Sequence, residues 1–138
     1  MRLLTLLLLV SFAFIQCKPE MKKAEIQEVL PEDFEIFYIQ FHTDSLFQIE
    51  HIAFPLEGVR KVNEGGAGDI LVPVLWQRDE WVIHKAFDDF NGSFNRNFQQ
   101  VGPIILEKIT DNNQLFSMER RFAKLGQEWN LIYYGLKK

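Results

Sequence analysis

The last third of the chain alternates between apolar and polar residues, and this pattern constrains the fold more than any other feature. Four segments separated by turn residues, 93–99, 104–110, 115–123 and 128–134, are expected to form an antiparallel meander. A turn at Leu125-Gly126 would pair Phe122 with Trp129. One face of this last hairpin then collects Phe116, Met118, Arg120, Phe122, Trp129, Leu131 and Tyr133. Because the other face is polar, the sheet must pack against a second layer.

The second layer is expected from an earlier segment with helical periodicity. Phe34, Phe37, Tyr38 and Phe41 recur at the spacing of one helical face, shortly after Pro31 and two acidic residues. Proline is tolerated in the first turn of a helix, and acidic residues suit its positive end. We interpret the aromatic stripe as core rather than as a cofactor-binding surface.

Shorter elements are expected between these two regions. Ser45 with Gln48 three residues later fits a capping box, so a second helix is expected over 46–52. Residues 59–62 and 70–76 are expected to be strands around a glycine-rich loop, and residues 79–87 a third helix. This order predicts an α+β fold, in which N-terminal helices pack in a strongly curved antiparallel sheet that forms a cone.

The first sixteen residues do not resemble part of a globular fold. Arg2 precedes thirteen largely apolar residues (3–15), a length that matches the hydrophobic region of a secretory signal and is too short to span a bilayer. The only cysteine, Cys17, follows directly and cannot form an internal disulfide. We predict a lipoprotein signal peptide at 1–16, a lipid on Cys17, a tether over 17–23 and one domain at 24–138. An ordinary signal peptide cut elsewhere and an uncleaved anchor are the alternatives.

The charge of the chain excludes one class of partner. Without residues 1–16 it would carry 14 basic and 19 acidic residues, a net charge of −5. Nucleic-acid-binding surfaces need clustered Lys and Arg, so no nucleic-acid partner is expected. The expected partners are the membrane, through the lipid, and either a small ligand or an envelope protein, with a homodimer through the sheet face as a further option. The predicted location is the bacterial cell envelope, at the outer membrane.

Part of the chain resembles a known family. The run FHTDSLFQIEHIAFPLEG, from Phe41 to Gly58, preceded by Asp33-Phe34, is similar to the signature of Bacteroidetes lipoproteins of domain-of-unknown-function family 4348. His51 departs from that signature, which usually has Arg there. The resemblance implies a nuclear transport factor 2-like (NTF2-like), or cystatin-like, fold and no established activity. The later landmarks of the family look like Trp81, Phe122 and the run 129–131.

Three candidate ligand-binding residues lie near the junction of the two expected helices. Asp44, Gln48 and His51 would face the mouth of the cone. The alternative for Asp44 and Gln48 is helix capping, and for His51 it is a solvated helix face.

The other three candidates lie in the last hairpin. Arg120 shares a face with apolar residues, where a guanidinium must be paired, with Asp44 as the candidate partner, or must open onto a ligand cavity. Trp129 and Tyr133, together with Tyr38, would line a pocket or form part of the core.

The sequence contains no recognisable catalytic set. The three histidines (42, 51 and 84) lack metal-ligand spacing, so no metal and no cofactor are expected. The favoured interpretation is a non-catalytic ligand- or partner-binding lipoprotein. The alternative is a small isomerase- or dehydratase-like enzyme that uses Asp44 or His42 with Tyr133 or Tyr38 in an apolar pocket. An assembly role through sheet pairing is a third possibility.

Overall fold

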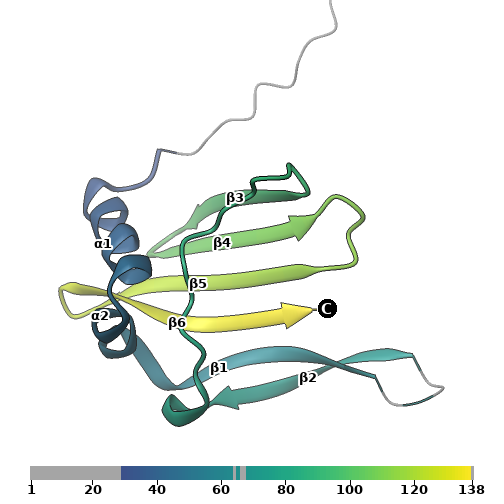
Figure 1. Cartoon of the computed structure of the whole chain (residues 1–138). Coiled ribbons are helices and arrows are strands. Elements are labelled where there is room, and N and C mark those ends of the chain that lie inside the picture. Colours follow the sequence, from purple (N-terminus) through teal and green to yellow (C-terminus); the bar gives the residue numbers. More distant parts are fainter. Residues whose placement is uncertain (1–28, 64, 66–67, 138) are drawn as a thin grey trace, which may run out of the picture.

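The computed structural model describes residues 29–63, 65 and 68–137 (Figure 1). Two helices, α1 (Glu32–Thr43) and α2 (Ser45–Glu50), precede all the strands. The predicted signal peptide, lipidated Cys17 and tether lie outside the described residues. No helix in the described part of the chain is long and apolar enough to cross a membrane. The strands are β1 (Ile52–Asn63), β2 (Asp69–Trp76), β3 (Phe94–Val101), β4 (Ile104–Asp111), β5 (Ser117–Leu125) and β6 (Glu128–Lys137).

The strands form one six-stranded sheet in the order β2-β1-β6-β5-β4-β3. The predicted α+β class and curved sheet are confirmed. Neighbouring strands are antiparallel except β1 and β6, which are parallel, so the sheet is mixed rather than wholly antiparallel. β1 and β6 both start beside the helices and run away from them, so the first and last strands of the chain lie side by side and parallel (Figure 1).

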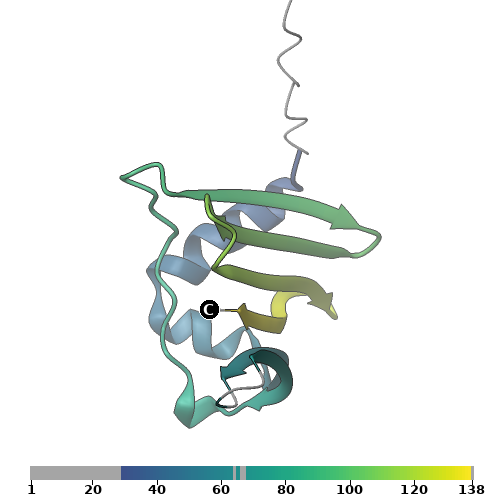
Figure 2. The same cartoon turned by 90° about the vertical axis from the view of Figure 1, so that its right-hand side faces the viewer.

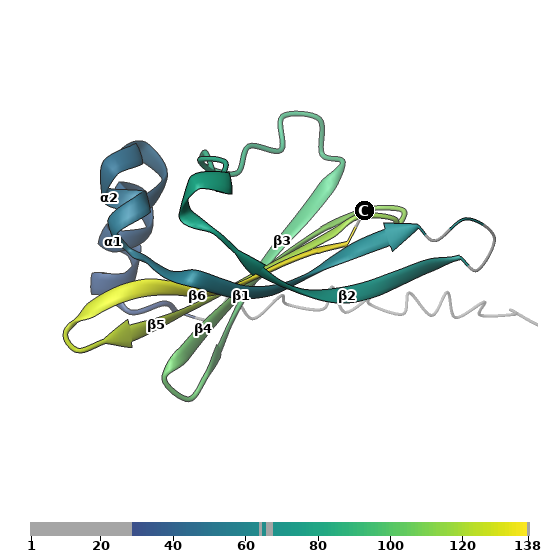
Figure 3. The ribbon, with the colours of Figure 1, turned by 90° about the horizontal axis from the view of Figure 1, so that it is seen from below.

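The helices and the segment between β2 and β3 cover the same side of the sheet (Figures 2 and 3). We call this side the inner face, and the space between it and its cover the cone. The core of the cone is aromatic, because Phe34, Phe37 and Phe41 of α1 are at most 6% exposed and pack edge-on against Phe122 of β5. The helix begins as expected, with the carbonyl of Pro31 accepting its first N–H groups. The predicted core stripe is confirmed.

The cap of α2 is not the predicted capping box. Asp44 is the N-cap residue, and its Oδ1 accepts hydrogen bonds from the N–H groups of Leu46 (3.0 Å) and Phe47 (3.1 Å). Both Asp44 and Ser45 are good capping residues, and the break after α1 falls at Asp44. Gln48 is therefore free for another role, and its side chain is fully buried.

The predicted third helix over 79–87 is wrong. Only a short 3₁₀ turn forms, at Arg78–Glu80, and the following residues cross the inner face without regular structure (Figure 1). This segment must connect the two edge strands of a six-stranded sheet, about 24 Å apart at the usual strand spacing. A nine-residue helix advances only about 14 Å, so an extended chain fits the distance better.

The last hairpin forms in a register different from the predicted one. Phe122 pairs with Leu131, and Lys124 rather than Phe122 pairs with Trp129. The turn lies at Gly126 and the residue after it, one position later than expected, because Gly126 takes the left-handed φ of +71° that glycine tolerates.

A β-bulge in β6 reverses the orientation of the residues that follow it. The pairing shifts between Arg121 and Phe122, and Ile132 is the extra residue. Tyr134 therefore faces the core and is 8% exposed, whereas Tyr133 lies on the outer face, where the guanidinium of Arg121 stacks on its ring at 4.1 Å. The expectation that Tyr133 faces inward is wrong.

Candidate functional site

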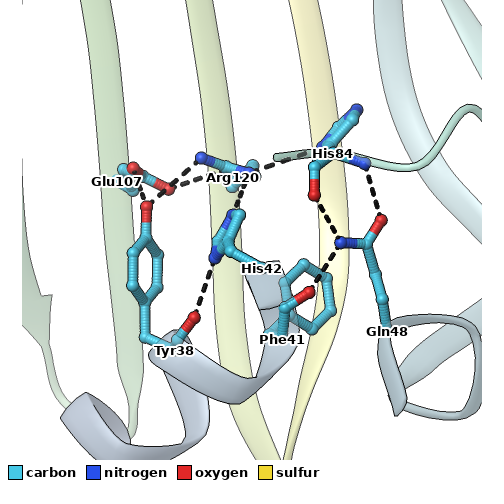
Figure 4. A network of polar contacts seen from close by, with 7 residues as sticks. All are labelled: Tyr38, Phe41, His42, Gln48, His84, Glu107 and Arg120. Carbon is cyan, nitrogen blue, oxygen red and sulfur yellow. Dashed lines mark hydrogen bonds and ion pairs between the residues drawn. The ribbon is translucent and has the colours of Figure 1, made fainter. Parts of the chain in front are cut away.

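A buried ion pair lies at the centre of the inner face (Figure 4). Arg120 of β5 and Glu107 of β4 are directly opposite in the strand register, and Arg120 Nε donates to Glu107 Oε2 at 2.7 Å. Arg120 is 1% exposed and Glu107 is fully buried. The inward position of Arg120 is thus confirmed. Its predicted pairing with Asp44 is wrong, because that carboxylate caps α2.

Tyr38 of α1 joins the ion pair from the helical layer. Its hydroxyl donates to Glu107 Oε1 at 2.6 Å and accepts from Arg120 Nη2 at 3.3 Å. Burial raises the pKa of Tyr38 well above its usual range, and the nearby Glu107 carboxylate raises it further. The phenol therefore keeps its proton and acts as a clamp between sheet and helix.

Two neutral histidines complete the environment of the guanidinium. His42 Nδ1 donates to the carbonyl of Tyr38 at 2.8 Å, so its Nε2 must be the acceptor that faces Arg120 Nη1 at 2.7 Å. His84 Nδ1 faces the same Nη1 at 3.4 Å. Burial, and secondarily the charge of Arg120, lower the pKa of His42 to about 4 and that of His84 to about 3. Both rings are therefore uncharged at neutral pH.

Gln48 fixes the extended segment that carries His84. Its Nε2 donates to the carbonyls of Phe41 (2.6 Å) and His84 (2.7 Å), and its Oε1 accepts from the N–H of His84 (2.7 Å) and from Trp81 Nε1 (3.2 Å). The backbone of His84 thus uses a side chain where a helix would use its own carbonyls. We call the whole set of Tyr38, His42, Gln48, Trp81, His84, Glu107 and Arg120 the Arg120 network.

The remaining predicted site residues lie outside the Arg120 network. His51 ends α2, stacks on Phe47 with ring centroids 3.8 Å apart, and bonds through Nδ1 to the Phe47 carbonyl at 2.8 Å. Trp129 donates through Nε1 to Asp33 Oδ2 at 3.1 Å and belongs to the aromatic core. The structure thus brings Gln48 and Arg120 together and separates them from Asp44, His51, Trp129 and Tyr133.

Sequence reasoning missed Glu107 and His84 as members of the site. A signal for Glu107 was present, because it alternates with Ile105 and Ile109, and all three side chains are buried on the inner face. For His84 there was no such signal, since its position depends on the bond to Gln48 across 36 residues.

The centre of the Arg120 network is closed by its own contacts. Among the described residues, no buried side-chain nitrogen or oxygen lacks a hydrogen-bond partner. The lone pair of His42 Nε2 is taken by Arg120, and the phenol proton of Tyr38 by Glu107. No group of three or more potential ligand side chains for a metal occurs in the described part of the chain. The arrangement joins the helices, the extended segment and the sheet through paired polar groups.

Two hollows lie elsewhere on the surface. A groove of about 330 Å³ runs beside the edge strand β2, lined by Glu57, Gly58, Pro73, Val74, Leu75 and Tyr133. A larger hollow of about 500 Å³, which we call the polar cleft, lies at the edge of the sheet farthest from the helices, where β4 and β6 finish and β3 and β5 begin. Its lining consists of Asn95, Lys108, Thr110, Asp111, Asn112, Gln114, Phe116, Ser117 and Lys137.

Comparison with solved structures identifies a similar fold. A crystal structure of an NTF2-like protein from Bacteroides fragilis superposes with a TM-score of 0.51 and 21% sequence identity, over 80% of this chain and 49% of that one. The chain thus spans about half the length of that protein. No protein-family model matches the chain, and no curated protein matches it. The resemblance to family 4348 stays a prediction, whereas the fold itself is NTF2-like.

Proposed function

We propose that this chain is a non-catalytic binding lipoprotein of the cell envelope, whose ligand or partner meets the outside of the cone. One observation carries the proposal: the polar side chains at the centre of the cone pair with one another, whereas Lys108, Thr110 and Ser117 of the polar cleft have no side-chain partner in the described chain. Buried polar groups that pair internally stabilise and orient a fold, whereas unpaired groups at a surface are available to a ligand.

The Arg120 network is poorly suited to isomerase- or dehydratase-like catalysis, although the NTF2-like fold is compatible with it. A general base works best with a pKa near the working pH. The pKa values of about 4 and 3 for His42 and His84 make both rings weak bases, and the raised pKa of Tyr38 makes it a weak acid. Asp44, the other candidate base, is an exposed helix cap.

The proposed location rests on the amino-terminal sequence. An apolar stretch at 3–15 followed by Cys17 and a polar tether favours export, lipidation of that cysteine and attachment to the outer membrane. The lipid would hold the domain at the membrane while the tether leaves its surfaces accessible.

Native mass spectrometry of the purified full chain tests the proposal. We expect a bound small molecule, a bound envelope protein or a second copy of the chain, and we expect it to persist in the His42→Gln and His84→Gln variants. Circular dichroism would establish that both variants fold. Loss of the bound species from folded variants would place the binding site inside the cone and overturn the proposal.

A further inference from the structure

The polar cleft lies on the outer face, at the end of the sheet opposite the helices. Thr110 of β4, Ser117 of β5 and Lys137 of β6 pair in one row across three strands, and Lys108 is two residues from Thr110 along β4. Glu107 faces inward, so its neighbour Lys108 faces outward. In Figure 1 the turn between β4 and β5 marks this end of the molecule. The volume of about 500 Å³ falls within the usual range of small-molecule sites.

Several polar side chains of the cleft have no partner within the described chain. Neither Lys108 nor Lys137 has a carboxylate of that part within ion-pair distance, and the hydroxyls of Thr110 and Ser117 accept or donate no hydrogen bond there. The nearby outer-face carboxylate of Glu119 is already held by Arg121 at 2.6 Å. Two ammonium groups and two hydroxyls therefore face the hollow unengaged.

The rim of the cleft is held in place by its own hydrogen bonds. Asn95 Nδ2 donates to Asn112 Oδ1 at 2.8 Å, and Asn112 Nδ2 donates to the carbonyl of Gly92 at 2.8 Å. Asp111 Oδ1 accepts from the N–H of Phe116 at 2.8 Å and so fixes the β4–β5 turn. A ligand would meet a preformed rim and would lose little energy in ordering it.

Gln114 in that turn has a backbone conformation that folding alone would not favour. Its φ is +60°, the left-handed region that a residue other than glycine enters at a cost of about 1 kcal/mol. Its side-chain amide lines the cleft and has no hydrogen-bond partner in the described chain. Glycine would relieve the backbone strain and remove the amide, so a change to glycine affects stability and ligand binding in opposite directions.

We propose that the polar cleft binds an acidic saccharide; this inference rests on the proposed binding function and names its ligand. Hydroxyl and amide groups both donate and accept hydrogen bonds, as the hydroxyl groups of a sugar require. Lys108 and Lys137 complement a carboxylate on that sugar. The carboxylate of Asp111 also lines the cleft, which leaves a net lining charge of +1 and favours carboxylates spaced along a sugar chain over the concentrated charge of a polyphosphate.

Isothermal titration calorimetry of the purified full chain tests the proposal, with trigalacturonic acid as the probe and galactotriose and inorganic phosphate in parallel. We expect the acidic trisaccharide to bind more tightly than either comparison, and more weakly at high salt. The Lys108→Met/Lys137→Met double variant should bind it at least about tenfold more weakly. Lys85→Met removes an exposed charge outside the cleft and should leave binding unchanged.

Gln114→Gly is a second variant, and a loss of binding in it could not be attributed to misfolding. It should keep or raise the thermal stability of the chain and still weaken binding of trigalacturonic acid. Failure of trigalacturonic acid to bind, equal binding of galactotriose, or unchanged affinity in the double lysine variant would each overturn the proposal. If a species bound in native mass spectrometry persists in that double variant, the wider binding function stands and only the saccharide site is refuted.

Discussion

The Arg120–Glu107 pair offers the sharpest test of how the cone is held together. Replacing Arg120 by Met, which has a similar length and no charge, would leave Glu107 fully buried with only the Tyr38 hydroxyl as donor. Breaking a buried ion pair by removing one partner usually costs about 3–5 kcal/mol. We expect a loss of that size in the free energy of unfolding, a large fraction of the roughly 5–15 kcal/mol available to a domain.

Two further variants separate burial from the loss of a charge. Arg120→Met/Glu107→Leu removes both charges and should recover much of the loss, because no carboxylate then remains unpaired. Arg121→Met removes the neighbouring charge on the outer face, where the side chain is 41% exposed and pairs with Glu119. That matched control should cost no more than about 1 kcal/mol.

Urea unfolding followed by tryptophan fluorescence measures all three variants. The reasoning requires the Arg120 variant to be much less stable than the Arg121 variant and less stable than the double variant. Equal costs for Arg120→Met and Arg121→Met would mean that the pair is not buried in solution, and the closed network would have to be abandoned.

Three further outcomes are expected. The folded-state pKa values of about 4 for His42 and about 3 for His84 lie below the unfolded value of about 6.5, so the unfolded state binds more protons at acidic pH. The free energy of unfolding should therefore be highest above about pH 6.5 and fall toward pH 4, by up to about 3 kcal/mol for His42. Urea unfolding at several pH values measures this slope, which a His42→Gln variant should flatten; an unchanged slope contradicts the assignment. Gln48→Leu should expose the His84 amide to hydrogen exchange and lower the melting temperature. An unaltered exchange rate would argue against the hydrogen bond from the His84 amide to Gln48. Cys17→Ala should move the protein from the membrane fraction to the soluble fraction, and continued firm membrane association would refute lipidation.

Local periodicity made much of the architecture predictable. The aromatic stripe of α1 repeats within three turns, and the alternation through Met118, Arg120 and Phe122 lies within one strand. Such patterns depend only on neighbouring residues, so the buried helix face and the inward Arg120 could be predicted from them. Glu107 could be found in the same way from its position in β4.

The errors have a common physical origin in contacts between distant residues. Ile132 looks like an ordinary strand residue, and only the pairing of β6 with β5 makes it a bulge that turns Tyr133 outward. The segment around His84 has a helical pattern, yet the carboxamide of Gln48 holds its backbone extended. Both features arise from tertiary structure, which overrides the local preference.

The closed network also argues quantitatively that a ligand would bind elsewhere. A ligand inside the cone would have to displace Arg120 from Glu107, or Tyr38 from both, before its own contacts could form. If opening costs about 3–5 kcal/mol, the binding-competent state is rare, and the apparent affinity falls by a factor of roughly a hundred to several thousand. At the polar cleft no such step is needed, since Lys108 and Thr110 have no side-chain partner in the described chain that a ligand would have to displace. The same chain can therefore keep a rigid interior and a receptive outer face, because the two demands fall on opposite sides of one sheet.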